Sequence, residues 1–258
     1  NLQMVAGNSE AALQAFTQRS KYAQARVETD PTDVDWVRGL IWSLNSVGNV
    51  LQQQGYFREA ETAFTSALEF SQWQADQMPD DVDLMRDRQV ARNKLGEIRF
   101  ARNDLPGALE AHTDALTIAE TLLASDPAST TYRRDVSYTQ ERIGDVMVAM
   151  GNKPGAKAAF DISLKLAEEL AAEFPTDTEY RRDLSISYER IGAMLVSDDA
   201  LDAGLDSYGK ALLIREELAA LDPDNKLRQR DLSVTFERTG DIQSLRGDRD
   251  SALLSHDA

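Results

Sequence analysis

Residues 132–144 read YRRDVSYTQERIG, and residues 180–192 read YRRDLSISYERIG. The two segments lie 48 residues apart and share their first four and last four residues. A more diverged third copy follows at the same spacing, with Arg230-Asp-Leu-Ser and then Glu237-Arg-Thr-Gly. Recurrence at one fixed period is the signature of a repeat architecture, so the repeat decides the fold before any single motif is considered.

The same period governs single residues along the whole chain. Glycines and prolines recur every 48 residues without an insertion, and an aspartate precedes three of the prolines: Gly48, Gly96, Gly144, Gly192 and Gly240; Pro31, Pro79, Pro127, Pro175 and Pro223; Asp30, Asp126 and Asp222. We therefore divide the chain, as one solenoid, into a partial repeat, four complete repeats and a second partial repeat, at residues 1–31, 32–79, 80–127, 128–175, 176–223 and 224–258.

Each repeat is predicted to form two helices. Proline ends the preceding helix because it lacks a backbone N–H and clashes with the previous turn. Apolar residues then recur at helical spacing, and glycine or asparagine marks the turn before the second helix. In the first complete repeat the two helices carry Leu40, Leu44, Val47 and Leu51, then Ala60, Phe64 and Ala67; the turns fall at Gly55, Asn103, Gly151 and Gly247.

Two capping boxes are predicted at the start of first helices. Thr176 with Glu179 has the spacing of a Ser/Thr cap and a Glu three residues later, and Thr32 with Asp35 is a weaker version. Both boxes place the N-cap at the residue that directly follows a proline, Pro175 or Pro31.

The pattern Leu44-x2-Val47-Gly48-x2-Leu51, continued by Ala60, Phe64, Ala67 and Pro79, resembles the tetratricopeptide repeat. The usual period of that family is about 34 residues, so each helix here is expected to be longer, at roughly 20 residues or 30 Å. The resemblance implies an all-α, right-handed superhelical solenoid of antiparallel helix pairs. Long-helix repeats of this kind resemble those of large bacterial multidomain proteins, where they accompany an effector domain.

Composition narrows the classes of function. The chain has no Cys and two His, and its 44 acidic and 28 basic residues give a net charge of −16. Disulfides and thiolate metal sites are therefore excluded, and the acidic balance argues against nucleic acid as a partner. No apolar run is long enough for a membrane span, and residues 1–7 lack the features of a signal peptide. We expect a cytoplasmic protein without a membrane partner.

No pattern of catalytic residues stands out. His112 and His256 occupy the position of Phe64 in their repeats, which predicts histidines that fill an aromatic core position rather than metal ligands. The glycines are isolated, so there is no phosphate-binding loop. We expect no enzyme activity, no cofactor and no metal.

The resemblance also implies where a partner would bind, because first helices line the concave groove of tetratricopeptide proteins. Three rows of residues would cross that groove, one basic, one apolar and one that changes from amide to acidic along the chain. They are Arg38, Arg86, Arg134, Arg182 and Arg230; Trp42, Val90, Tyr138, Ile186 and Val234; and Asn45, Asn93, Glu141, Glu189 and Glu237, extended by Asn49, Glu97, Asp145 and Asp241.

Two interpretations of these rows remain open. In the first, each arginine pairs with an acid of a neighbouring repeat and forms a structural ladder, for which Asp87, Asp135, Asp183 and Asp231 are placed suitably. In the second, the apolar row anchors a partner segment and the charges set its register.

The first complete repeat is aromatic and rich in amides, with Trp36, Trp42, Asn45, Asn49, Gln52 and Gln53, whereas later repeats carry acids. Basic residues in a partner are expected at the C-terminal, acidic end.

Arg92 and Arg99 depart from the repeat because they stand where the first complete repeat has Leu44 and Leu51. Their stems would pack on the core while their heads pair with acids of an adjacent helix. Alternatively, they would form a special contact for an acidic partner, a nucleotide phosphate or a regulatory segment.

The sequence as a whole predicts a non-catalytic scaffold that binds a protein or peptide segment in its groove. The alternative is a regulatory or oligomerisation arm of a fused effector or enzyme domain. The chain opens and closes in mid-repeat, which predicts a fragment of a longer protein or self-association through uncapped ends.

Overall fold

The computed structural model describes residues 9–77, 81–248 and 255, and in these ranges all regular structure is helical. The chain divides into two compact units, Asn1–Tyr132 and Arg133–Ala258. The N-terminal unit contains α2 (Ser9–Thr29), α3 (Val34–Gln53), α4 (Phe57–Gln77), α5 (Val82–Ala101) and α6 (Leu105–Ser125). The C-terminal unit contains α8 (Lys153–Glu173), α9 (Thr178–Ser197), α10 (Leu201–Leu221) and α11 (Lys226–Arg246), together with nearly all of α7 (Thr130–Ala149).

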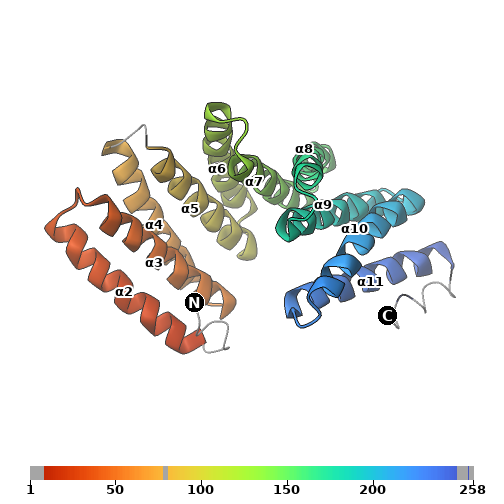
Figure 1. Ribbon diagram of the computed structural model, residues 1–258, viewed down its shortest axis with the longest axis horizontal. Coiled ribbons are helices and arrows are strands. Elements are labelled where there is room, and N and C mark those ends of the chain that lie inside the picture. Colours follow the sequence, from red (N-terminus) through yellow and green to blue (C-terminus); the bar gives the residue numbers. More distant parts are fainter. Residues whose placement is uncertain (1–8, 78–80, 249–254, 256–258) are drawn as a thin grey trace. The chain divides into compact units, whose positions relative to one another are not determined.

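Consecutive helices pack on one another within each unit, as the prediction of helix pairs required (Figure 1). The described helices have 20 or 21 residues, which agrees with the predicted length. First helices begin at positions 34, 82, 130, 178 and 226, so successive starts are 48 residues apart.

The helices end close to the prolines and turn residues that predicted their ends. Four helices end two residues before a proline: α2, α6, α8 and α10, before Pro31, Pro127, Pro175 and Pro223. Pro79 lies outside the described residues. Within each pair the turn contains one residue with positive φ, namely Gly55, Asn103, Gly151, Asp199 and Gly247, at 80°, 62°, 75°, 62° and 86°. Asp199 is the member of this series that the sequence did not indicate.

The two predicted capping boxes are wrong by one residue. The N-cap of α9 is Asp177, whose carboxylate accepts hydrogen bonds from the backbone N–H groups of Glu179 and Tyr180 at 2.8 and 3.1 Å. Asp33 caps α3 and accepts from the N–H of Trp36 at 3.3 Å. Because the turn after each proline is one residue longer than the prediction assumed, the aspartate rather than the preceding threonine reaches the unpaired N–H groups.

The core repeats one close contact between a glycine of the first helix and a ring of the second. A Cβ built on Gly48 would lie 2.6 Å from the Phe64 ring, and on Gly144 only 2.3 Å from Phe160. Both rings are almost completely buried. The recurring glycine is therefore required by the close approach of the two helices, and the large ring fills the space that the missing side chain leaves.

Candidate interaction site

The basic row forms a ladder of ion pairs to the next repeat. Arg38 Nε lies 3.2 Å from Asp87, Arg134 Nε lies 2.5 Å from Asp183, and Arg182 Nε lies 2.7 Å from Asp231. The structural interpretation of these arginines is thus confirmed for three pairs. Arg86 and Asp135 belong to different units.

Burial raises the pKa of the Asp87 and Asp183 carboxyls above its ordinary value, while the guanidinium groups of Arg38 and Arg134 act in the opposite direction. The carboxylates therefore depend on their arginines for compensation. A ladder of this kind fixes the register between adjacent first helices and leaves these arginines less available to a partner.

The acids of the third row are also paired within the protein. Glu141 and Asp145 on α7 face two arginines, since Arg142 bonds to both and Arg190 Nε lies 3.6 and 3.1 Å from them. Glu141 is buried. This part of the predicted acidic surface is therefore neutralised by the chain's own side chains.

Glu189 is neutralised by a buried arginine that the sequence did not indicate. Arg215 on α10 is 4 % exposed, and its guanidinium donates to Glu189 at 2.7 Å, to the Asp231 carbonyl at 2.9 Å and to Ser185 Oγ at 3.2 Å. It also contacts Thr235 Oγ1. One side chain thus joins α9, α10 and α11 in the C-terminal unit.

Asn93 belongs to the core. Its side chain is buried, and its Oδ1 lies 2.9 Å from Nδ1 of His112. His112 is also buried and covers Gly96 as Phe64 covers Gly48. The prediction that His112 fills an aromatic core position is confirmed, whereas His256 lies outside the described residues.

Arg92 and Arg99 both pair with acids of adjacent helices. Arg92 Nη1 lies 2.8 Å from Asp114 on α6. Arg99 lies between Glu61 of α4, at 3.7 Å, and Glu110 of α6, at 3.5 Å, and donates to the Gly107 carbonyl. Both side chains are 27 % exposed, so their stems pack against neighbours. The geometry favours the packing interpretation over a dedicated contact for an acidic partner.

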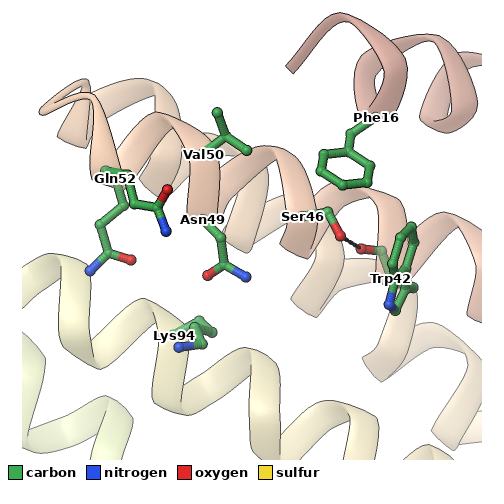
Figure 2. Close-up of a pocket in the computed structure, with 8 residues that line it drawn as sticks. Phe16, Trp42, Ser46, Asn49, Val50, Gln52 and Lys94 are labelled. Atoms are coloured by element: carbon green, nitrogen blue, oxygen red, sulfur yellow. Dashed lines mark hydrogen bonds between the residues drawn. The ribbon is translucent and has the colours of Figure 1, made fainter. Parts of the chain in front are cut away.

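One pocket, here called the Trp42 pocket, opens where α2, α3 and α5 meet. Its volume is 520 Å³, and its lining consists of Phe16, Trp42, Ser46, Asn49, Val50, Gln52, Gln53 and Lys94. Figure 2 shows Phe16 directed from α2 toward the Trp42 end, and Asn49 pointing from α3 toward Lys94 on α5. Four residues of the aromatic, amide-rich repeat are therefore brought into one hollow.

The aromatic end of the Trp42 pocket is held in a defined geometry. Trp42 is 47 % exposed, although Phe16 meets it edge-on at 5.5 Å between ring centroids. The Arg19 guanidinium lies 4.3 Å from the ring centroid of Trp42. These two contacts fix the indole ring and leave almost half of the residue open to solvent.

The family model for the tetratricopeptide repeat matches residues 40–72, which span most of α3, the turn and most of α4. This stretch of the chain is similar to a tetratricopeptide repeat. The matched segment includes Trp42, Asn49, Gln52 and Gln53, which line the Trp42 pocket. No curated protein matches the sequence.

Several solved structures have a similar fold. BtubC (BKLC) from P. vanneervenii superposes with a TM-score of 0.72 at 19 % identity, over 96 % of this chain and 88 % of that one. The apo form of RapI gives 0.60 at 10 % identity, over 99 % and 91 %. The Rap conjugation gene regulator of plasmid pLS20, solved with the Phr* peptide, gives 0.58 at 13 % identity, over 88 % and 55 %. At these identities the likeness concerns the fold alone.

The other predicted groove residues differ in exposure. Tyr138 is 39 % exposed, with the Arg142 guanidinium 5.3 Å from its ring centroid. Arg230 and Glu237 on α11 are exposed, whereas Asn45, Val90, Ile186 and Val234 are half-buried. The apolar row is thus most open at its two aromatic members.

A second hollow lies in the C-terminal unit among α8, α9 and α10, with a volume of 350 Å³ and a mostly apolar lining that includes Leu184 and Ile214. At its edge the Tyr188 hydroxyl donates to Glu168 at 2.9 Å. Burial and this carboxylate together raise the pKa of Tyr188 to about 12, so the hydroxyl stays protonated and structural.

Neither a metal-binding cluster nor a membrane-spanning helix occurs among the described residues. No group of three or more His, Asp or Glu side chains there is arranged to hold a metal ion. None of the described helices is both long and apolar enough to cross a membrane.

Proposed function

We propose that this tetratricopeptide-repeat protein is a non-catalytic interaction module that holds a segment of a partner protein in its groove, with the Trp42 pocket as the main anchor. The observation that carries the proposal is the half-exposed indole of Trp42 at the end of a hollow lined by amide side chains. Solvent-exposed tryptophans that line a pocket are typical of residues that dominate binding energy at interfaces.

The pocket lining suits an extended peptide. An apolar side chain of the peptide would pack on Trp42 and Phe16, and the carboxamides of Asn49, Gln52 and Gln53 would bond its backbone. A carboxamide carries both donors and acceptors, so it can pair with a peptide group in either direction. A hollow of 520 Å³ is large enough for one or two side chains.

The structural neighbours offer a precedent for this type of ligand. The Rap regulator of plasmid pLS20 was solved with a peptide bound, and its fold is similar to that of this chain. This precedent supports a peptide as the class of partner.

For the C-terminal unit we retain the prediction of basic residues in the partner, confined to α11. Glu237 there is exposed, whereas Glu141, Asp145 and Glu189 already have arginine partners. Any attraction for a basic segment would therefore come from the end of the row rather than from its full length.

A peptide selection with two matched tryptophan variants tests the proposal. A random peptide library displayed on phage would be selected against the purified chain, and recovered sequences would be synthesised with a fluorescent label for anisotropy titration. Trp42→Ala is expected to weaken binding by at least about tenfold, because truncating a central aromatic anchor costs about 2 kcal/mol or more.

Trp73→Ala is the matched control, since Trp73 is 39 % exposed on α4 and does not line the pocket. It should leave the affinity unchanged. The proposal fails if no peptide is selected, or if the selected peptides bind the Trp42→Ala chain as tightly as the unaltered chain while circular dichroism shows both to be folded.

A further inference from the structure

The hollow of the C-terminal unit, here called the Tyr188 hollow, lies apart from the predicted groove rows. Its walls are mainly apolar and come from α8, α9 and α10, with Ala171, Leu184 and Ile214 among the lining residues. None of the described lining residues belongs to the three rows that the sequence assigned to the groove. A volume of 350 Å³ suits one large apolar side chain of a partner.

A carboxylate without an ion pair lies at the edge of the Tyr188 hollow. Glu168 on α8 is exposed, and its Oε1 accepts the hydrogen bond from the Tyr188 hydroxyl at 2.9 Å. Its Oε2 has no partner among the described residues, although an ionised carboxylate accepts through both of its oxygens. The Tyr188 hydroxyl therefore holds the Glu168 carboxylate beside the apolar walls and leaves one oxygen open to a donor from outside the chain.

The described cations around the hollow are already engaged. Arg181 lines the hollow, Lys210 Nζ lies 5.6 Å from the Tyr188 ring centroid, and Lys165 stands one turn before Glu168 on α8. Each has an acidic partner: Arg181 bonds to Glu217, Lys210 Nζ lies 2.8 Å from Asp206, and Lys165 Nζ lies 4.0 Å from Glu169. The negative charge of Glu168 thus has no local counterpart, so the hollow is complementary to an apolar side chain next to a cation.

The pairing of an acid with a hydroxyl at this place occurs in one repeat. The corresponding pairs of residues in the other repeats are Gln24 and Leu44, Gln72 and Arg92, Glu120 and Gln140, and Glu216 and Phe236. Since those repeats form the same pairs of helices, the solenoid does not require the bond between Tyr188 and Glu168. The arrangement is a feature of the surface of this repeat.

We propose that the Tyr188 hollow binds a basic segment of a partner protein, whose apolar side chain enters the hollow while an adjacent Lys or Arg donates to the open oxygen of Glu168. This site is separate from the Trp42 pocket and goes beyond the proposed function. The apolar contact supplies the anchor, and the charge-assisted hydrogen bond to Glu168 fixes the register of the segment and rejects acidic ones.

An array of immobilised synthetic peptides tests the pairing of these two features. Each peptide carries one Leu, Phe or Trp and, at varied spacing, one Lys, norleucine or Glu. The array is probed with the Trp42→Ala chain, so that the proposed groove anchor is absent. We expect binding to peptides that combine the apolar residue with Lys, weaker binding to matched norleucine peptides and none to Glu peptides. The absence of this order overturns the inference and leaves the proposed function of the groove standing.

Two variants then locate the binding, measured by fluorescence anisotropy with the best Lys peptide. Ala172→Leu enlarges an exposed residue of the lining and should weaken binding at least about tenfold, because the new side chain occupies the place of the apolar anchor. Glu168→Gln keeps an acceptor for the Tyr188 hydroxyl but removes the charge, and should weaken binding about threefold to fivefold, as for an exposed ion pair. The norleucine peptide should bind the Glu168→Gln chain and the unaltered chain alike.

Glu216→Gln is the matched control for the charge. Glu216 occupies the repeat position of Glu168, is exposed and does not line the hollow, so its replacement should change affinity by less than about twofold. Equal losses in the two Gln variants would show a diffuse effect of charge and overturn the inference. Unchanged binding by Ala172→Leu, with circular dichroism showing a folded chain, would overturn it as well.

Discussion

At the residue scale, two glycines of α3 provide a test of close packing against helix propensity. Gly39 has nothing within 4 Å of a built Cβ, whereas the Cβ at Gly48 would lie 2.6 Å from the Phe64 ring. Gly39→Ala should raise the free energy of unfolding by about 0.5–1 kcal/mol, since alanine favours the helix. Gly48→Ala should lower it by about 1–3 kcal/mol through overpacking. Guanidinium denaturation followed by circular dichroism measures both, and equal effects would contradict the packing argument.

We expect the removal of the Arg215 side chain to lower the stability of the C-terminal unit strongly. The corresponding positions hold Ala23, Ser71, Ala119 and Ala167, so alanine fits the backbone there. Arg215→Ala would nevertheless leave Glu189, 19 % exposed at its side chain, without its ion pair. We expect a loss of about 3 kcal/mol in the free energy of unfolding.

Two companion variants separate this charge effect from a simple loss of packing. Glu189→Gln combined with Arg215→Ala should recover part of the stability, because the orphaned charge is removed as well. Arg230→Ala, at an exposed arginine of α11, should stay within about 0.5 kcal/mol of the unaltered chain. If the double variant were no more stable than Arg215→Ala, the ion pair would not be the cause.

At the scale of the element, the start of α9 distinguishes two candidate caps. Asp177→Ala removes the acceptor for the Glu179 and Tyr180 N–H groups and should lower stability by about 1 kcal/mol. Thr176→Ala, one residue earlier, should change it by less than about 0.5 kcal/mol, because Thr176 lies outside the helix and is exposed. Thermal melts of the two variants decide between them, and a larger effect at Thr176 would restore the capping box.

The elements themselves were predictable because their signals are local and repeated. Proline, glycine and apolar spacing fixed the ends and faces of helices such as α3 and α9. The cap was missed because Thr176 and Asp177 are both good N-caps, and the choice depends on the length of the turn after Pro175. Asp199 was missed because a non-glycine residue with positive φ leaves little trace in sequence.

The site was predictable only in part, for a related reason. Comparing equivalent positions of the repeats indicated Trp42 and Asn49, which line the pocket, and the Arg–Asp ladder, whose ion pairs the structure contains. Phe16 and Lys94 reach the pocket from the preceding and following helices. Phe16 shares the repeat position of Phe64, and Lys94 shares that of Arg142, but neither position was assigned to the groove. Arg215 occurs once, so comparing repeats does not reveal it. Asn93 was assigned to the groove because it occupies the repeat position of Asn45. It is buried instead because its side chain bonds to His112, a substitution in another helix.

At the scale of the whole molecule, stability should vary along the solenoid, because each repeat contributes separately together with its contacts to its neighbours. The two helices α4 and α5 bury polar side chains, including Gln74 and Gln89. Gln74 Oε1 on α4 and Arg88 Nε on α5 are buried without a hydrogen-bond partner among the described residues. Each such atom costs about 1–3 kcal/mol, so the junction of these two helices is expected to open first in the N-terminal unit.

Gln74→Leu should strengthen the junction. Gln74 is 2 % exposed, and the corresponding positions hold the buried leucines Leu122, Leu170 and Leu218, so the pocket for the new side chain matches one that the chain already uses. Removing the unpaired carboxamide should raise the free energy of unfolding by about 1–2 kcal/mol. Native-state hydrogen exchange should show the gain as slower exchange in α4 and α5, with α9 and α10 unchanged, because the gain is confined to adjoining helices. Gln18→Leu, on an exposed helix face, should give no such protection; uniform slowing along the chain would show instead that the solenoid opens as a single unit.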